Sequence, residues 1–200
     1  MSYTIDFKTL LTRLNEGTQV ELNDMMRCRE HRAMLQNVLF EKYHAPLLSF
    51  TLNIPGPIKN NSLLSDIFYI GIKSINAIFN NHQIHILQEH YSNEITGNEY
   101  ICAFDGNADD VKNEAITLEN THPLGRLFDI DIIDPKGHKL SRQQYRSCLI
   151  CNKQAQDCAR NRTHSIEEMQ LAILKLIKES NLIVAKLQYQ IEHFVNPLTS

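Results

Sequence analysis

Apolar and acidic side chains alternate along residues 127–133 (LFDIDII), and this segment constrains the fold more than any other part of the 200-residue chain. Successive side chains of a β-strand point to opposite faces. The pattern therefore predicts a strand with Phe128, Ile130 and Ile132 in a core and with Asp129 and Asp131 together on the other face. Such a strand requires a sheet whose apolar face is covered.

The rest of the chain has the patterns of helices and further strands. Apolar spacing predicts helices over residues 23–41, 65–79 and 109–118, and strands over 47–53, 84–87 and 100–104. Ser165 and Glu168 form a capping box that begins a last helix. The apolar stripe of that helix consists of Ile166, Met169, Ile173, Ile177, Val184, Leu187, Ile191 and Phe194, before Pro197. We expect one α+β domain over residues 1–200, with a mixed β-sheet, flanking helices and a long C-terminal helix.

Composition and charge exclude several classes of protein. A content of 42% hydrophobic and 22% charged residues excludes collagen-like, disordered and disulfide-scaffold chains. The net charge of −3 argues against a protein that coats nucleic acid. We find no apolar run near the about 18 residues of a membrane helix, and no signal peptide at the start. With five cysteines and no secretion signal, we expect a cytoplasmic protein with reduced thiols.

Two neighbouring segments carry opposite charge. Residues 89–134 contain eleven acids and two bases, whereas residues 136–164 contain seven bases and one acid. An acidic strip beside a basic strip suits a metal ion and a polyphosphate that are held together. The alternative interpretation is two solvated surfaces of different sign.

The paired aspartates of residues 128–132 are the first candidate site. Two adjacent carboxylates repel each other unless a cation lies between them, and Mg²⁺ takes a few carboxylates while sharing its remaining ligands with phosphate oxygens. Gly125 permits a close backbone approach, and Arg126 is able to bind a phosphate in a bidentate way. We therefore predict that Asp129 and Asp131 hold Mg²⁺, with Arg126 as a further catalytic residue. The alternatives are a plain acidic strand face and an ordinary turn before it.

A cluster of cysteines is the second candidate site. Cys148, Cys151, Cys158 and His164 follow the order C-x2-C-x6-C-x5-H, and three sulfurs with one nitrogen match a closed zinc site. The middle spacing is short for a zinc motif, so the alternative is a helix with inert cysteines three residues apart. Arg160 and Arg162 lie within the cluster, and Lys59 follows a rigid NIPGPI segment. These three cations are candidates for binding an anionic substrate, although a structural turn explains the NIPGPIK segment equally well.

Three blocks of sequence resemble the citrate lyase holo-acyl-carrier-protein synthases, which are phosphoribosyl-dephospho-CoA transferases. The blocks are REHRAMLQ (29–36) with SFTLNIPGPIK (49–59), then ENTHPLGRLFDIDIID (119–134), and then SCLICNKQAQDCARNRTHS (147–165). The resemblance covers most of the chain. It also implies a nucleotidyltransferase-like fold whose D-x-D metal pair corresponds to Asp129 and Asp131.

This resemblance implies a specific reaction. The enzyme would transfer the phosphoribosyl-dephospho-CoA prosthetic group from its triphosphate precursor, triphosphoribosyl-dephospho-CoA, to a serine of the citrate lyase acyl carrier protein subunit, releasing diphosphate. Charge neutralisation dominates such a transfer. Mg²⁺ on the aspartate pair would hold the phosphates, and Arg126 with Arg160 or Arg162 would stabilise the departing diphosphate.

Two other functions remain open from the sequence. One is a nucleotidyltransferase with a different protein acceptor. The other is a non-enzymatic zinc-knuckle adaptor, which would bind a carrier protein or RNA. Recognition of RNA normally uses aromatic side chains among the basic ones. The basic segment contains only Tyr145 as an aromatic residue, so we expect no nucleic-acid partner.

Overall fold

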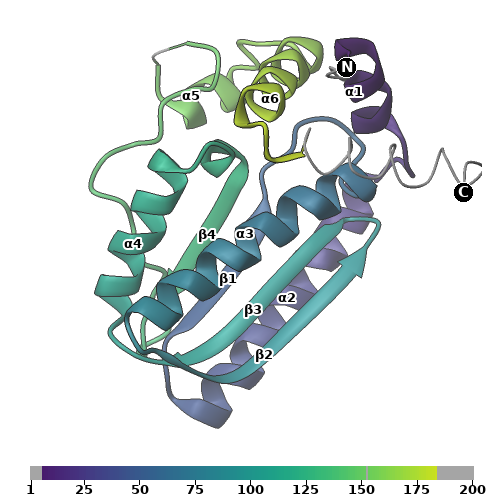
Figure 1. Cartoon of the computed structure of the whole chain (residues 1–200). Coiled ribbons are helices and arrows are strands. Elements are labelled where there is room, and N and C mark those ends of the chain that lie inside the picture. The colour runs from purple at the N-terminus through teal and green to yellow at the C-terminus, as the bar shows by residue number, and fades with distance from the viewer. Residues whose placement is uncertain (1–5, 152, 184–200) are drawn as a thin grey trace, which may run out of the picture.

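The computed structural model describes residues 6–151 and 153–183, and these residues form helices around one β-sheet (Figure 1). The helices are α1 (Phe7–Asn15), α2 (Leu22–Tyr43), α3 (Ser62–Asn81), α4 (Ala108–Thr121), a 3-10 turn η1 (Gly125–Leu127), α5 (Ala155–Arg160) and α6 (Ile166–Ser180). The strands are β1 (Leu47–Leu52), β2 (His85–Glu94), β3 (Gly97–Asp105) and β4 (Phe128–Ile133).

The sheet has the strand order β2-β3-β1-β4. Helix α3 connects β1 to β2, a tight turn joins β2 to β3, and α4 connects β3 to β4. This β-α-β-β-α-β arrangement is the split βαβ, or ferredoxin-like, topology. Each strand is antiparallel to its neighbours, so the sheet is antiparallel where we expected a mixed one. The reason is that each helical crossover skips one strand position, and the returning strand fills it in the opposite direction.

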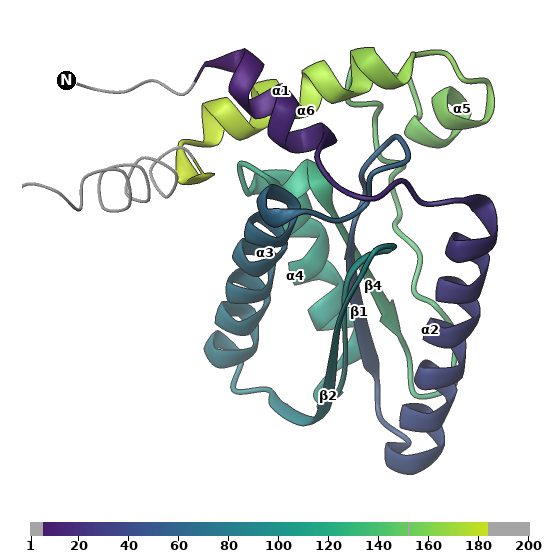
Figure 2. The ribbon, with the colours of Figure 1, turned by 90° about the vertical axis from the view of Figure 1, so that its right-hand side faces the viewer.

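The sheet is covered on both faces. Helices α3 and α4 pack on one face and α2 on the other, whereas α1, α5 and α6 gather beyond one end of the strands (Figures 1 and 2). The larger core lies under α3 and α4, where Phe50 of β1 stacks on Phe68 of α3 with ring centroids 4.7 Å apart. A smaller core with Leu39, Leu47 and Ile101 lies under α2.

The predicted strand at residues 127–133 is confirmed, including its two faces. Phe128, Ile130 and Ile132 are buried, and they belong to the core under α3 and α4. Asp129 and Asp131 therefore lie on the opposite face, which α2 covers in part. The polar part of β2 was not predicted, because a strand at the edge of a sheet is paired on one side and its exposed face has no apolar pattern.

The C-terminal helix is confirmed up to Ser180. Ser165 caps α6 through the predicted capping box with Glu168, and Ile173 and Ile177 are buried. The helix ends where Asn181 adopts a left-handed conformation, with φ of 54°. The second half of the predicted stripe, from Val184 to Phe194, lies outside the described residues.

Helix α3 is more apolar than our sequence analysis allowed. Among the described helices, it alone is long and apolar enough, by length and composition, to cross a membrane. In this fold Leu64, Ile67, Phe68 and Ile75 of α3 are buried in the core against the sheet. Packing within the protein therefore accounts for the apolar composition of this helix.

Candidate functional site

The aspartate pair lies on the sheet face below α2, at the edge strand β4. In the register of the sheet, Asp129 is opposite Thr51 and Asp131 is opposite Ser49. Thr51 is in turn opposite Glu99 of β3. Because side chains at paired positions lie on the same face, Glu99, Thr51 and Asp129 form one polar row across three strands.

The two aspartates have different surroundings. The side chain of Asp129 is exposed in a groove, yet desolvation by the groove walls and the charge of Asp131 raise its pKa. Lys139, Arg146 and Arg32 oppose this shift. Asp131 is less exposed and forms an ion pair with Lys139. Lys139 therefore partly neutralises the aspartate pair in this structure.

Side chains of α4 and of the basic segment bind the outer edge of β4, together with one backbone hydrogen bond of 2.8 Å from the N–H of Leu140 to the carbonyl of Ile132. Glu119 of α4 accepts a hydrogen bond of 2.8 Å from the backbone N–H of Ile130, the residue between the two aspartates. Glu119 is almost fully buried and also forms ion pairs with Arg142 and Arg146. Arg146 donates a hydrogen bond of 2.7 Å to the carbonyl of Phe128. This network fixes β4 and its aspartates to α4 and to the basic segment.

Three cavities share Asn53 as a lining residue, and Asp129 lines two of them. The large cavity, of about 720 Å³, is lined by Arg126, Arg146, Met169, Ile173 and three predicted zinc ligands, Cys148, Cys158 and His164. The open groove, of about 550 Å³, contains Asp129, Asp131, Lys139, Arg142 and Arg146. The small cavity, of about 180 Å³, contains Arg29, Arg32, Thr51, Lys59, Glu99 and Asp129. The acidic and basic segments therefore do converge in space.

Gly125 and Arg126, the residues before the strand, have separate roles. Gly125 is buried in η1, and a Cβ atom there would lie 2.5 Å from the carbonyl oxygen of Leu118. Packing against α4 thus accounts for this glycine without a ligand. Arg126 lines the large cavity and donates a hydrogen bond to the carbonyl of Ser147. Burial and the nearby Arg146 lower its pKa.

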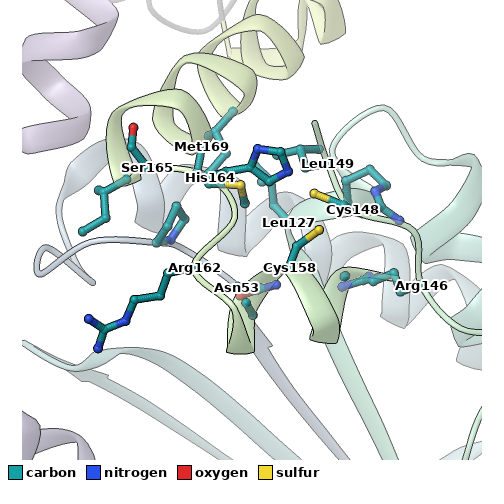
Figure 3. A pocket seen from close by; sticks show the side chains of 16 residues that line it. Asn53, Leu127, Arg146, Cys148, Leu149, Cys158, Arg162, His164, Ser165 and Met169 are labelled. Carbon is teal, nitrogen blue, oxygen red and sulfur yellow. The ribbon is translucent and has the colours of Figure 1, made fainter. Parts of the chain in front are cut away.

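The other three predicted cations lie in three different places. Lys59 lines the small cavity and donates a hydrogen bond of 2.5 Å to the carbonyl of Ile54. Arg162 lines the large cavity, and its guanidinium extends away from Cys158 and His164 (Figure 3). Arg160 is exposed at the end of α5 and lines none of the three cavities. The structure therefore does not bring Arg160 to the site.

The predicted Cys/His cluster is assembled. The candidate ligand atoms of Cys148, Cys151, Cys158 and His164 all lie within 4.8 Å of one another. The Sγ atoms of Cys151 and Cys158 are 3.5 Å apart, and His164 Nε2 is 3.3 Å from Cys151 Sγ. Figure 3 shows Cys148, Cys158 and His164 gathered beside the large cavity. Among the residues that the structure describes, this is the one group of three or more candidate ligands at such distances.

The alternative of a cysteine-bearing helix is wrong for the first two cysteines. They lie in a tight hairpin in which the N–H of Cys148 donates a hydrogen bond of 2.7 Å to the carbonyl of Lys153. Burial raises the pKa of Cys148, but N–H groups of Cys151 and Ile150 and the neighbouring thiols lower it to about 7. Burial and those thiols raise the pKa of Cys158 to about 11. The surroundings therefore favour the thiolate form of one cysteine. A bound cation would stabilise the thiolate form of the other cysteines as well.

Our sequence analysis missed Arg29, Arg32, Glu99, Glu119 and Arg146 as site residues. Arg29 and Arg32 belong to the REHR block that carried the family resemblance, and residues three apart share one helix face. That spacing was the available signal. The sequence contains no such signal for Glu99 and Glu119, because the strand register and the packing of α4 on β4 bring these residues to the site.

The geometry around β4 fits transfer chemistry on phosphates. A split βαβ sheet presents two carboxylates between cavities that contain arginine and lysine, an arrangement that suits a transferase acting on a polyphosphate donor.

Comparisons with known proteins identify the particular family. The profile of the apo-citrate lyase phosphoribosyl-dephospho-CoA transferases matches residues 20–180. A relative of that name from Escherichia coli O139:H28 is 35% identical over 164 residues, which cover 80% of this chain and 90% of the relative. A relative from Streptococcus pyogenes serotype M3, with the same name preceded by "probable", is 39% identical over 173 residues, covering 80% and 87%. The chain belongs to this family, as its resemblance predicted.

Proposed function

We propose that this protein transfers the phosphoribosyl-dephospho-CoA group from its triphosphate precursor to a serine of the citrate lyase acyl carrier protein subunit. The observation that carries the proposal is the convergence of Asp129, Asp131 and the cation-lined cavities around Asn53. Family membership supplies the donor and the acceptor. A bacterial enzyme that modifies citrate lyase would act in the cytoplasm.

The reaction is a displacement at phosphorus. The serine Oγ forms a bond to the α-phosphorus, and the bond from this phosphorus to the bridging oxygen breaks. The bridging oxygen keeps the electron pair and leaves within diphosphate, while the serine proton passes to solvent. Arg126 and Arg162 would contact phosphates of the donor through charge-assisted hydrogen bonds.

The aspartate pair fits Mg²⁺ by its chemistry. Asp129 and Asp131 present hard oxygen donors on one face of β4, and desolvation together with the charge of Asp131 raises the pKa of Asp129, whose ionised form a cation would stabilise. No third carboxylate joins them at ligand distance among the described residues, which suits an ion that keeps water and phosphate ligands. Bound Mg²⁺ would neutralise charge on the phosphates.

The Cys/His cluster fits zinc. Three thiols and one imidazole within 4.8 Å of one another match the soft ligands and the four-coordinate geometry of a structural zinc ion. We propose that zinc ties the hairpin of Cys148 and Cys151 to α5 and to the start of α6. Its role would be structural, because four protein ligands leave no open position.

The test of the proposed function is a mass measurement. The protein is incubated with Mg²⁺, triphosphoribosyl-dephospho-CoA and the apo carrier subunit, and the carrier is weighed. We expect a gain of one phosphoribosyl-dephospho-CoA group. A gain only with another nucleotide donor would indicate a different nucleotidyltransferase. The absence of any gain with every metal tested would favour the adaptor interpretation.

A further inference from the structure

The small cavity below α2 has a charge distribution that the proposed roles above do not explain. It is lined by the three cations Arg29, Arg32 and Lys59 and the two carboxylates Glu99 and Asp129. Arg32 forms an ion pair with Glu99, which also accepts a hydrogen bond of 3.1 Å from Cys28 Sγ. Glu99 is therefore already neutralised within the fold.

Arg29 and Lys59 are the two cations left without such a partner. Among the described residues, neither forms an ion pair with a carboxylate, although both face the same cavity. Burial and the charge of Arg29 lower the pKa of Lys59. An anion placed between these two cations would offset the electrostatic repulsion between them.

The size of the small cavity limits which anion fits. Its volume of about 180 Å³ is enough for several water molecules. A cavity of this size has room for an ion such as diphosphate, and its excess of cations over carboxylates favours an anion. By contrast, the large cavity, at about 720 Å³, lies within the range of about 300–1,000 Å³ that is usual for extended small molecules.

We propose that the small cavity is the binding site of the leaving diphosphate, with Arg29 and Lys59 as its principal ligands. This inference rests on the proposed function and specifies how the donor is oriented. Asp129 lines both the small cavity and the open groove, so the reacting phosphorus lies beside Asp129. The dephospho-CoA part, which has its own diphosphate, then occupies the large cavity with Arg126.

This orientation also fixes the direction from which the acceptor approaches. Attacking and leaving oxygens lie roughly in line across the phosphorus. With diphosphate in the small cavity, the carrier serine enters from the open groove, on the side of Lys139 and Arg142.

The experiment measures direct binding by calorimetry, with inorganic diphosphate and with dephospho-CoA as separate probes of the full chain. The variants are Arg29→Ala and Arg126→Ala. The matched control is Arg27→Ala, which removes an exposed arginine of α2 that is paired with Asp24 outside the small cavity. Lys59→Met is a second variant of the small cavity, and thermal melting verifies that each variant folds.

We expect Arg29→Ala and Lys59→Met each to weaken diphosphate binding about tenfold or more, because each removes a charge-assisted contact. Neither should change the affinity for dephospho-CoA. Arg126→Ala should weaken the binding of dephospho-CoA and leave the binding of diphosphate unchanged, and Arg27→Ala should change neither affinity. Diphosphate binding that depends on Arg126 and not on Arg29 or Lys59 would overturn the inference, as would no binding of diphosphate at millimolar concentration.

The binding pattern does not depend on catalysis. Normal modification of the carrier together with an altered pattern would overturn only the orientation of the donor. The expected pattern without modification of the carrier would instead remove the proposed function and leave the diphosphate site.

Discussion

The ionised carboxylate of Asp129 carries an electrostatic cost in the folded protein. Its folded-state pKa is raised, so the folded protein favours the protonated carboxyl more than the unfolded chain does. This penalty is absent below the pKa of the unfolded state and fully present above the folded-state pKa. At neutral pH the ionised carboxylate therefore destabilises the fold, as is common for groups that serve a reaction.

We expect Asp129→Asn to abolish carrier modification and to raise the melting temperature at neutral pH. Loss of the charge would remove a ligand of the proposed Mg²⁺, at a cost of several kcal/mol of transition-state stabilisation, and it would also remove the desolvation penalty. Single-turnover transfer and thermal melting measure the two effects. The control is Asp134→Asn, at a carboxylate that accepts hydrogen bonds from the N–H groups of Lys136 and His138 outside the cavities. A transfer rate near that of the wild type would refute the assignment of Asp129.

We also expect the rate of carrier modification to fall at acidic pH. Protonation of Asp129 would remove the negative charge that the proposed Mg²⁺ requires, and the raised pKa of Asp129 moves this loss to a higher pH than for an ordinary aspartate. We expect the rate to decline as the pH falls through that pKa, while the melting temperature does not decline in parallel. A pH–rate profile with saturating Mg²⁺ measures this, and a flat profile down to the usual aspartate range would contradict it.

Glu119 has a structural task at the same site. Glu119→Gln retains an acceptor for the Ile130 N–H but leaves Arg142 and Arg146 without their buried counter-ion. We expect a loss of about 3–5 kcal/mol in the free energy of unfolding, as for other broken buried pairs. Urea denaturation measures it. The exposed Glu114→Gln, on the same helix, is the control and should change stability little; equal effects of the two variants would argue against the network.

At the scale of elements, close packing of α3 on the sheet positions β1 and β4. Gly71 of α3 faces Phe50 of β1 and Phe128 of β4, and a Cβ atom there would lie only 2.3 Å from the Phe50 ring. The absence of a side chain allows this close approach. The same contact fixes the strand pair whose other face carries Thr51 and Asp129.

We expect Gly71→Ala to destabilise the protein by about 1–3 kcal/mol through overpacking. In an exposed helix position, replacing glycine by alanine usually raises the stability by about 1 kcal/mol, so the expected effect has the opposite sign. Asn76→Ala, on the exposed side of α3, is the matched control and should be neutral or stabilising. Chemical denaturation of both variants measures the difference, and a more stable Gly71→Ala variant would show that the helix moves away from the sheet at no cost.

At the scale of the whole molecule, the Cys/His cluster joins the basic segment to the rest of the fold. The cluster connects the hairpin of residues 148–151 to α5 and to the start of α6, and α6 packs on α1. The large cavity lies within this assembly and is partly lined by it. Loss of a shared ion would therefore loosen one wall of the cavity.

We expect the purified protein to contain about one zinc ion per chain. Cys151→Ser should remove the zinc and lower the melting temperature, whereas Cys28→Ser, in α2, should retain it. A chelator should lower the melting temperature of the wild type, because the free energy of metal binding contributes to folding. Elemental analysis measures the zinc content. Protein free of zinc with normal stability would leave the cysteines as packing residues.

Local patterns along the chain were sufficient to predict several features of this protein. Alternation over residues 127–133 defined β4 and placed both aspartates on one face, and the order of three cysteines and one histidine predicted the cluster. These features depend on residues close together in the chain, so the geometry of a strand or a short loop suffices to predict them. Other features became visible only in the folded molecule: the sheet is antiparallel, Glu99 shares the small cavity with Asp129, Glu119 binds the N–H of Ile130, and Arg160 lies away from the site. These outcomes depend on strand order and packing between distant segments, which no local pattern encodes.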